Sequence, residues 1–173
     1  MVRPVRLLAA VLLATGAAQL LAAAGPTDPE IAHIAYPAGA IDVAAAKQAL
    51  AKSHDAKVRA FAETMVRDHE AVNVQALALV KKLHVTPTDN AISKSLSAQA
   101  KATEAKLAAL DGAAFDRAYV ANEVAFHGAV NGALKTTLIP DADNKELKTL
   151  LETGLALFTE HQTHAEHLGA SLK

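Results

Sequence analysis

The sequence contains no cysteine and no tryptophan, and only 3% of its 173 residues are aromatic. Without cysteine the chain can form neither a disulfide framework nor a thiolate metal site, and it cannot be anchored through an acylated cysteine. Any metal ion would have to be bound by imidazole and carboxylate groups. Because aromatic residues are scarce, the core has to be built from alanine, leucine and valine.

Beyond residue 24 the sequence also lacks an apolar run long enough to cross a membrane. Removing residues 1–24 takes Arg3 and Arg6 from the 17 basic residues, which leaves 15 against 18 acidic residues and a net charge of −3. This balance argues against nucleic acid or an anionic membrane surface as a partner. We expect no stable membrane insertion after cleavage. Whether the chain forms a homodimer or binds another envelope protein stays open.

The first 24 residues have the layout of a secretory signal peptide. Two arginines precede an apolar run from Leu7, and small residues at 22–24 come before a polar segment. We therefore expect cleavage after about Ala24 and a bacterial protein that is periplasmic or secreted. The alternative is an uncleaved membrane anchor over 7–24, because this apolar run approaches the minimum length of a membrane span.

The remaining chain predicts an all-α fold, because alanine and leucine lose little side-chain freedom in a helical turn. Apolar residues recur at helical spacing over about 37–53, 56–83, 92–109, 113–138 and from 143 to the end. Residues 25–36 read as a linker or irregular segment. Pro37 either kinks a helix or starts one, and we place the start of the first helix at this residue. Residues 37–173 then form a single helical-bundle domain.

The apolar stripe is thinner over about 92–109 than in the other four helices. Two amphipathic pairs separated by a long crossover have the connectivity of ferritin-like bundles. We therefore predict a ferritin-like up-down bundle with an extra crossover helix.

A short echo links the second and fourth predicted helices. Residues 69–73 read HEAVN and residues 127–131 read HGAVN, and the same alignment pairs Phe61 with Tyr119. The echo favours a duplicated helix pair. Chance matching in a chain rich in alanine and valine is the alternative.

Three of the eight histidines are predicted to point into the bundle. His69 and His127 share helix faces with apolar residues, and His161 lies at the centre of the last apolar stripe. Asp42 and His69 lie about 12 and 15 residues from the first interhelical turn, so their heights differ by roughly 4 to 5 Å. Glu123 or His127 can share a layer with His161 in the same way.

Inward carboxylates and imidazoles are the groups with which helical bundles hold iron, copper or zinc. We predict a site for a divalent transition metal (Cu, Zn or Fe), serving storage, buffering or stress protection. Its candidate ligands are Asp42, His69, Glu123, His127, His161 and His164.

Two other interpretations stay open. In the first, the chain is a structural or partner-binding bundle of the cell envelope. Its buried histidines then form a polar layer, hydrogen-bonded to carboxylates or to Asn73 and Asn131 at i+4. In the second, the histidines make the protein a pH sensor.

Catalytic motifs are not apparent. Three positions before His69 stands Val66, and three before His127 stands Val124, so the Glu-x-x-His motif of di-iron bundles is missing there. We predict no catalytic residue, no organic cofactor, and neither ferroxidase nor catalase activity.

Several strings resemble the bacterial exported family called domain of unknown function 4142. They are GAID at 39–42, VRAFAETMVRDHEAVNVQALALVKKLHV at 58–85, LAALDGAAFDRAYVANEVAFHGAV at 107–130 and LFTEHQTHAEHL at 157–168. The resemblance implies a ferritin-like bundle in the periplasm and implies no established activity. Two positions depart from the family pattern: Asp42 stands where Glu is usual, and Phe126 where an acidic residue often precedes the histidine.

Overall fold

The computed structural model describes residues 25–172, which are all-α. The helices are α1 (Asp28–Lys52), α2 (Ala56–Lys82), α3 (Ala91–Ala108), α4 (Gly112–Ala133), the π-helix η1 (Leu134–Leu138), α5 (Ile139–Asp141) and α6 (Lys145–Ser171). The expected signal peptide at 1–24 lies outside the described residues. Within 25–172, no helix combines the length and apolar character that a membrane span requires.

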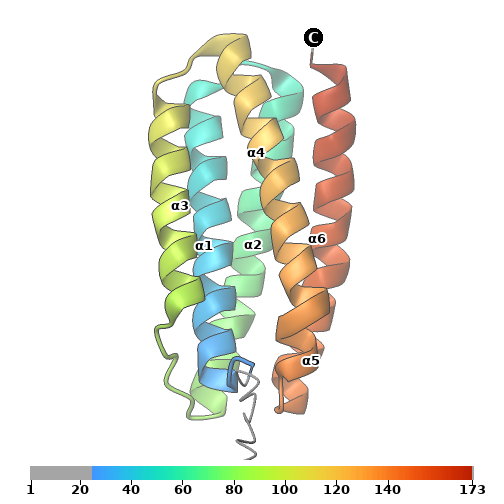
Figure 1. Cartoon of the computed structure of the whole chain (residues 1–173). Helices are drawn as coiled ribbons and strands as arrows, with labels where there is room; N and C mark the ends of the chain where they lie inside the picture. The colour runs from blue at the N-terminus through green and yellow to red at the C-terminus, as the bar shows by residue number, and fades with distance from the viewer. Residues whose placement is uncertain (1–24, 173) are drawn as a thin grey trace, which may run out of the picture.

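The long helices run side by side along one axis (Figure 1). α1 packs mainly against α2, and α4 packs mainly against α6, while α2 and α6 join the two pairs. Between the pairs, α3 runs along the outside of α1 and returns the chain to the end where α4 begins (Figure 1). The two pairs and the crossover expected from the apolar pattern are therefore present.

The first helix begins earlier than expected. Residues 28–36 are the first part of α1, so the expected linker is mostly helical, and Pro37 lies inside the helix. Locally, the backbone N–H of Thr27 donates to Oε2 of Glu30, which caps the new start. At longer range, the Asp28 carboxylate accepts hydrogen bonds from the backbone of residues 143 and 144. These contacts, together with burial of Ile31, offset the hydrogen bond that proline cannot form.

The fourth helix is not uniform to residue 138. α4 ends at Ala133, and η1 follows as one widened turn in which the backbone N–H of Ile139 donates to the carbonyl of Leu134. Leu134 and Leu138 both remain buried in this turn. Widened turns of this kind are rare in helices and often occur near functional sites.

Polar caps fix where α2 and α6 begin. Asp55 accepts hydrogen bonds from the backbone N–H groups of Lys57 and Val58. Asn144 does the same for the first turn of α6. Such caps satisfy amide groups that have no partner within the helix, and they set the height of each following side chain.

Two apolar clusters form the core. One contains Ala46, Ala49, Val58, Phe61, Ala62, Met65, Leu107, Phe115, Tyr119, Val120, Ala165 and Leu168. The other contains Ile31, Ile34, Leu134, Leu138, Ala142, Leu147, Leu151 and Phe158. Between these two clusters, each of the four bundle helices α1, α2, α4 and α6 carries at least one buried polar residue. The core is thus divided by a polar layer, and this layer is the candidate site.

Candidate metal centre

Five polar side chains from four helices form the layer. Asp42 comes from α1, His69 from α2, Glu123 and His127 from α4, and His161 from α6. None of the five is more than 4% exposed. Burial of so many ionisable groups is costly unless they are paired or bind an ion.

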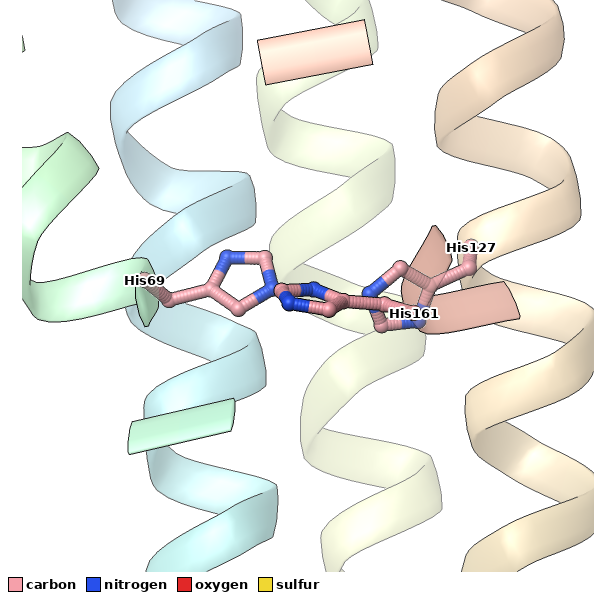
Figure 2. Close-up of side chains that lie close together, drawn as sticks. All are labelled: His69, His127 and His161. Carbon is pink, nitrogen blue, oxygen red and sulfur yellow. The ribbon is translucent and has the colours of Figure 1, made fainter. Parts of the chain in front are cut away.

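The three imidazole rings point toward one another (Figure 2). Ring centroids are 5.5 Å apart for His69 and His127, 5.3 Å for His69 and His161, and 5.5 Å for His127 and His161. Each ring offers one nitrogen, and these nitrogens lie within 4.8 Å of one another. The ring of Phe158 stacks on His69 at a centroid distance of 4.6 Å and helps to hold it in place.

The carboxylates lie against the same imidazoles. Oδ2 of Asp42 is 3.5 Å from Nε2 of His69 and 3.5 Å from Nε2 of His127. Oε2 of Glu123 is 3.6 Å from Nδ1 of His127. Asp42, Glu123 and His127 therefore form a second group whose ligand atoms lie within 4.8 Å, and it shares His127 with the first. Although Asp42 is shorter than glutamate, it still reaches two of the three histidines.

Two histidines have their remaining ring nitrogen held from outside the layer. Nδ1 of His127 lies 3.0 Å from the backbone carbonyl oxygen of Glu123, and Nε2 of His161 lies 3.0 Å from Oδ2 of Asp68. Because a carbonyl or carboxylate oxygen only accepts, these ring nitrogens must carry the proton. The opposite nitrogen of each neutral ring then presents a lone pair. This arrangement is typical of metal-binding histidines.

Asp68 is a site residue that the sequence argument did not single out. Its carboxylate accepts from Nε and Nη2 of Arg67 at 2.7 and 3.1 Å, as well as from His161. The hydrogen bond from Arg67 is the main reason that the pKa of Asp68 is lowered. The side chain is only 17% exposed, and its place directly before His69 in an Asp-His pair was the available signal.

Within the layer, many buried polar atoms receive no hydrogen bond when the carboxyl groups are ionised. They are Oδ1 and Oδ2 of Asp42, Nδ1 and Nε2 of His69, Oε1 and Oε2 of Glu123, Nε2 of His127 and Nδ1 of His161. Well over 90% of buried polar groups in proteins have a partner. Eight such unpartnered atoms are concentrated in this one layer, whose residues could hold a metal ion.

The model of the family described as domain of unknown function (DUF4142) matches residues 13–168. The chain belongs to this family. Neither the curated proteins nor the solved structures contain a match. Membership in the DUF4142 family covers nearly the whole chain and includes all five residues of the layer.

Burial shifts the acid–base behaviour of the layer in this DUF4142 protein. Desolvation lowers the pKa of His69 to about 3 and that of His127 to about 4, so both rings are neutral at pH 7. Desolvation also raises the pKa of Asp42 to about 7. The pKa of Glu123 is raised well above its ordinary value by burial and by the nearby Asp42. The metal-free layer therefore tends to hold protons on its carboxyl groups.

Not every candidate ligand joins the layer. His164 is exposed, and its ring packs edge-on against Phe61 with centroids 5.1 Å apart. The expectation that His164 lies in the site is wrong, because a spacing of three residues turns it about 60° around the helix from His161.

The alternative in which Asn73 and Asn131 hydrogen-bond to the buried histidines is wrong at both positions. Nδ2 of Asn131 donates to the backbone of Phe158 and to Gln162, across the helix pair, while His69 receives no hydrogen bond from Asn73. The two asparagines thus do not satisfy the histidines that precede them by four residues.

Proposed function

We propose that this chain is a ferritin-like bundle that binds one divalent transition-metal ion in its core. His69, His127 and His161 supply nitrogen ligands, and Asp42 and Glu123 supply oxygen ligands. The observation that carries the proposal is the set of unpartnered buried atoms on these residues. A metal ion satisfies such atoms together, whereas hydrogen bonds would need a separate donor for each.

The ferritin-like assignment rests on connectivity. Two helix pairs joined by one long crossover are typical of ferritin-like folds, which build metal sites from inward side chains of facing helices. Here each of the four bundle helices contributes at least one residue to the layer. The missing Glu-x-x-His motif separates this layer from a di-iron oxidase centre.

Distances within the layer fit a metal ion better than hydrogen bonds. The two Asp42–histidine separations of 3.5 Å are long for hydrogen bonds. With metal–ligand bonds of about 2.1 Å, neighbouring ligands of a tetrahedral ion lie roughly 3.4 Å apart. Oδ2 of Asp42 therefore already stands at about the spacing of a neighbouring Zn(II) ligand from Nε2 of His69 and from Nε2 of His127.

Charge favours a divalent ion. At full ionisation the layer carries two buried negative charges, from Asp42 and Glu123, while the imidazoles are neutral. A divalent cation neutralises both carboxylates, which removes most of the cost of burying them. Imidazole and carboxylate ligands suit Zn(II), Cu(II) and Fe(II), and we regard Zn(II) as the first ion to test because it accepts tetrahedral sites without preference for other geometries.

The ligand set also favours holding a metal over catalysis. Catalytic zinc sites keep three protein ligands and leave one position for water or substrate. Here His69, His127 and His161 form one group of possible ligands, and Asp42 and Glu123 form a second group with His127, so the protein offers more than three ligands. We therefore propose storage, buffering or stress protection as the role. The signal-peptide layout of residues 1–24 supports the periplasm as the compartment.

One observation favours the competing function, a structural bundle without metal. The raised pKa values of Asp42 and Glu123 allow protons to neutralise the same layer. Elemental analysis of untagged protein isolated from its native compartment separates the two functions. About one equivalent of Zn, Cu or Fe per chain supports the metal-binding proposal. Protein that is isolated without metal and also fails to bind these ions in vitro overturns it.

A further inference from the structure

A second feature of the fold is a large cavity that adjoins the polar layer. It has a volume of about 1050 Å³ and is lined by residues of all five long helices, α1, α2, α3, α4 and α6. His69 and His127 form part of its wall, but most of its lining is apolar. Ligand pockets typically measure about 300–1,000 Å³ and have a mostly apolar lining. The cavity is thus as large as a site for a sizeable small molecule.

The cavity exists because α3 is held at its two ends. Ser93 and Leu107 are the buried residues of α3, and they stand near its first and last turns. Near the start of the helix, Nδ1 of His33 lies 3.1 Å from Oγ of Ser93. Near its end, Lys52 donates to the backbone carbonyl of Ala108 at 2.9 Å. Between these attachments, Leu96, Ala100 and Thr103 of α3 line the cavity.

Small side chains keep this space open. The facing surfaces of α1, α3 and α4 carry alanines, among them Ala40, Ala44, Ala100, Ala125 and Ala129. An alanine cannot reach across a gap between helices, so the helices do not fill the space with their own side chains. A core is normally packed to high density, and a region left unpacked on three helices is therefore unusual.

Large apolar side chains stand exposed at the edge of the cavity. Tyr36, Leu77 and Ile92 are 39%, 49% and 50% exposed, and all three belong to its lining. Among residues 25–172, the large apolar side chains recorded as exposed are these three and Val74. Their concentration at one place marks a site that receives an apolar partner.

We propose that this cavity binds a single-chain amphiphile of the fatty-acid class, with its hydrocarbon tail inside and its head group in water at the edge. Ser93 and Leu107 are 14 residues apart, so the stretch of α3 between these two buried residues, along which the cavity lies, is about 21 Å long. An acyl chain in one bilayer leaflet spans about 15 Å, half of the hydrocarbon core. The cavity is therefore long enough for one such tail.

Charge agrees with this occupant. Among the residues that line the cavity, the acidic and basic side chains other than histidine are Asp28, Lys101 and Glu104. Lys101 and Glu104 are exposed on the outer helix α3, so the charges lie toward water. An uncharged interior fits an uncharged tail, and it excludes a ligand whose body is ionic.

The probe for this site is a fluorescent polyene fatty acid, titrated into purified protein that has been treated with a chelator. We expect saturable binding at one molecule per chain. Unlabelled saturated fatty acids should displace the probe, with affinity rising roughly tenfold for every two methylene groups added until the cavity is filled. Binding should not require metal, which keeps this test separate from that of the polar layer.

Two variants and a matched control locate the ligand. Ala44→Phe on α1 and Ala125→Phe on α4 place a ring in the cavity from exposed positions, so the fold should tolerate them. Ala121→Phe lies one turn from Ala125 on the same helix, is also exposed, and does not line the cavity. We expect at least tenfold weaker probe binding for the first two and unchanged binding for the third.

Three results would overturn the proposal. They are the absence of saturable binding, equal binding by all three variants, and a concentration-dependent dimer that occludes the cavity and excludes the probe. Zinc binding by Ala125→Phe equal to that of the unmodified chain would show that the fold and the polar layer remain intact in the variant.

Discussion

Nε2 of His161 on α6 lies 3.0 Å from Oδ2 of Asp68 on α2, and this contact orients the opposite nitrogen of the ring toward the other two histidines. Asp68 is itself held by Arg67. An outer carboxylate of this kind fixes the tautomer and rotation of a metal-binding histidine. The helix pair α1–α2 therefore contributes to the site both directly, through His69, and indirectly, through Asp68.

Asp68→Ala tests this contact. Without the carboxylate, the His161 ring loses its fixed tautomer, and we expect metal affinity to fall by about 10- to 100-fold. Isothermal titration with Zn(II) measures the change. Glu70→Ala is the matched control, because Glu70 is an exposed acid on the same helix that pairs with Lys47 at 2.8 Å, away from the layer. Equal affinities for the two variants would contradict the assigned role of Asp68.

Metal binding should release protons. At pH 6.5 the carboxyl group of Asp42, with its pKa raised to about 7, is mostly protonated, and burial raises the pKa of Glu123 in the same direction. A metal ion displaces protons from its ligands. We therefore expect a net release of between one and two protons per ion, measured from the dependence of the binding enthalpy on the ionisation enthalpy of the buffer. A binding enthalpy that is the same in every buffer would contradict the participation of these two carboxyl groups.

Stability of the metal-free protein should be greatest near pH 6.5. The pKa values of His69 and His127 are lowered to about 3 and 4, and that of His161 is also lowered. Below pH 6.5 the unfolded chain therefore binds protons that the folded chain does not bind, and stability falls as the pH falls. Asp42 and Glu123 act in the opposite sense: the stability that protonated Asp42 contributes falls as the pH rises above its ordinary pKa and is lost as the pH passes its folded pKa of about 7. The raised pKa of Glu123 changes stability in the same direction.

Below pH 6.5 the effect of the three imidazoles on the free energy of unfolding exceeds the opposite effect of the two carboxyl groups. Above pH 6.5 the carboxyl groups determine how the free energy of unfolding changes with pH. Thermal melts in the presence of a chelator at pH 5, 6.5 and 8 should therefore show a maximum at the middle value. The double variant Asp42→Asn/Glu123→Gln should lose much of the decrease on the alkaline side. Melting temperatures that rise steadily toward pH 5 would rule out the predicted protonation states.

Gly39 allows α1 to approach α2 one turn before Asp42. A Cβ atom at this position would overlap Oδ1 of Asn73. We expect Gly39→Ala to change the free energy of unfolding by less than about 1 kcal/mol in chemical denaturation, because the overlapping atoms end a flexible side chain that can rotate away.

Two comparison variants isolate the cause. The change Gly39→Ala/Asn73→Ala removes the overlapping side chain and should remove whatever cost the contact retains. Gly132→Ala in α4 has no neighbour within 4 Å of the new Cβ atom and should stabilise the helix by about 0.5 to 1 kcal/mol. A loss of clearly more than about 1 kcal/mol in Gly39→Ala alone would show that the Asn73 side chain cannot rotate away.

Much of the fold could be predicted from the sequence because the signals were local and repeated. Apolar periodicity located α2, α3 and α6 to within a few residues. The same periodicity placed His69, His127 and His161 on inward faces, and burial confirms this orientation. Counting residues from the turns was enough to place Asp42 near His69, because an α-helix has a constant rise.

Features that depend on contacts between distant segments could not be predicted in this way. Pro37 suggested a helix start, but the bonds from residues 143 and 144 to Asp28 stabilise a start nine residues earlier. The pairing of Asp68 with His161 depends on how α2 and α6 are rotated relative to each other. His164 is exposed because it lies about 60° around the helix from His161, and the regular spacing of the histidines did not reveal this difference.

The most direct test of the central claim is a Zn(II) titration of purified, untagged protein alongside two variants. The unmodified chain should bind one equivalent, with a matching rise in melting temperature that follows from binding to the folded state alone. His69→Ala/His161→Ala should bind none, whereas His167→Ala, an exposed histidine on the same helix as His161, should bind like the unmodified chain. Equal Zn(II) binding by the double variant and the unmodified chain, or no binding by any of the three, would contradict the account.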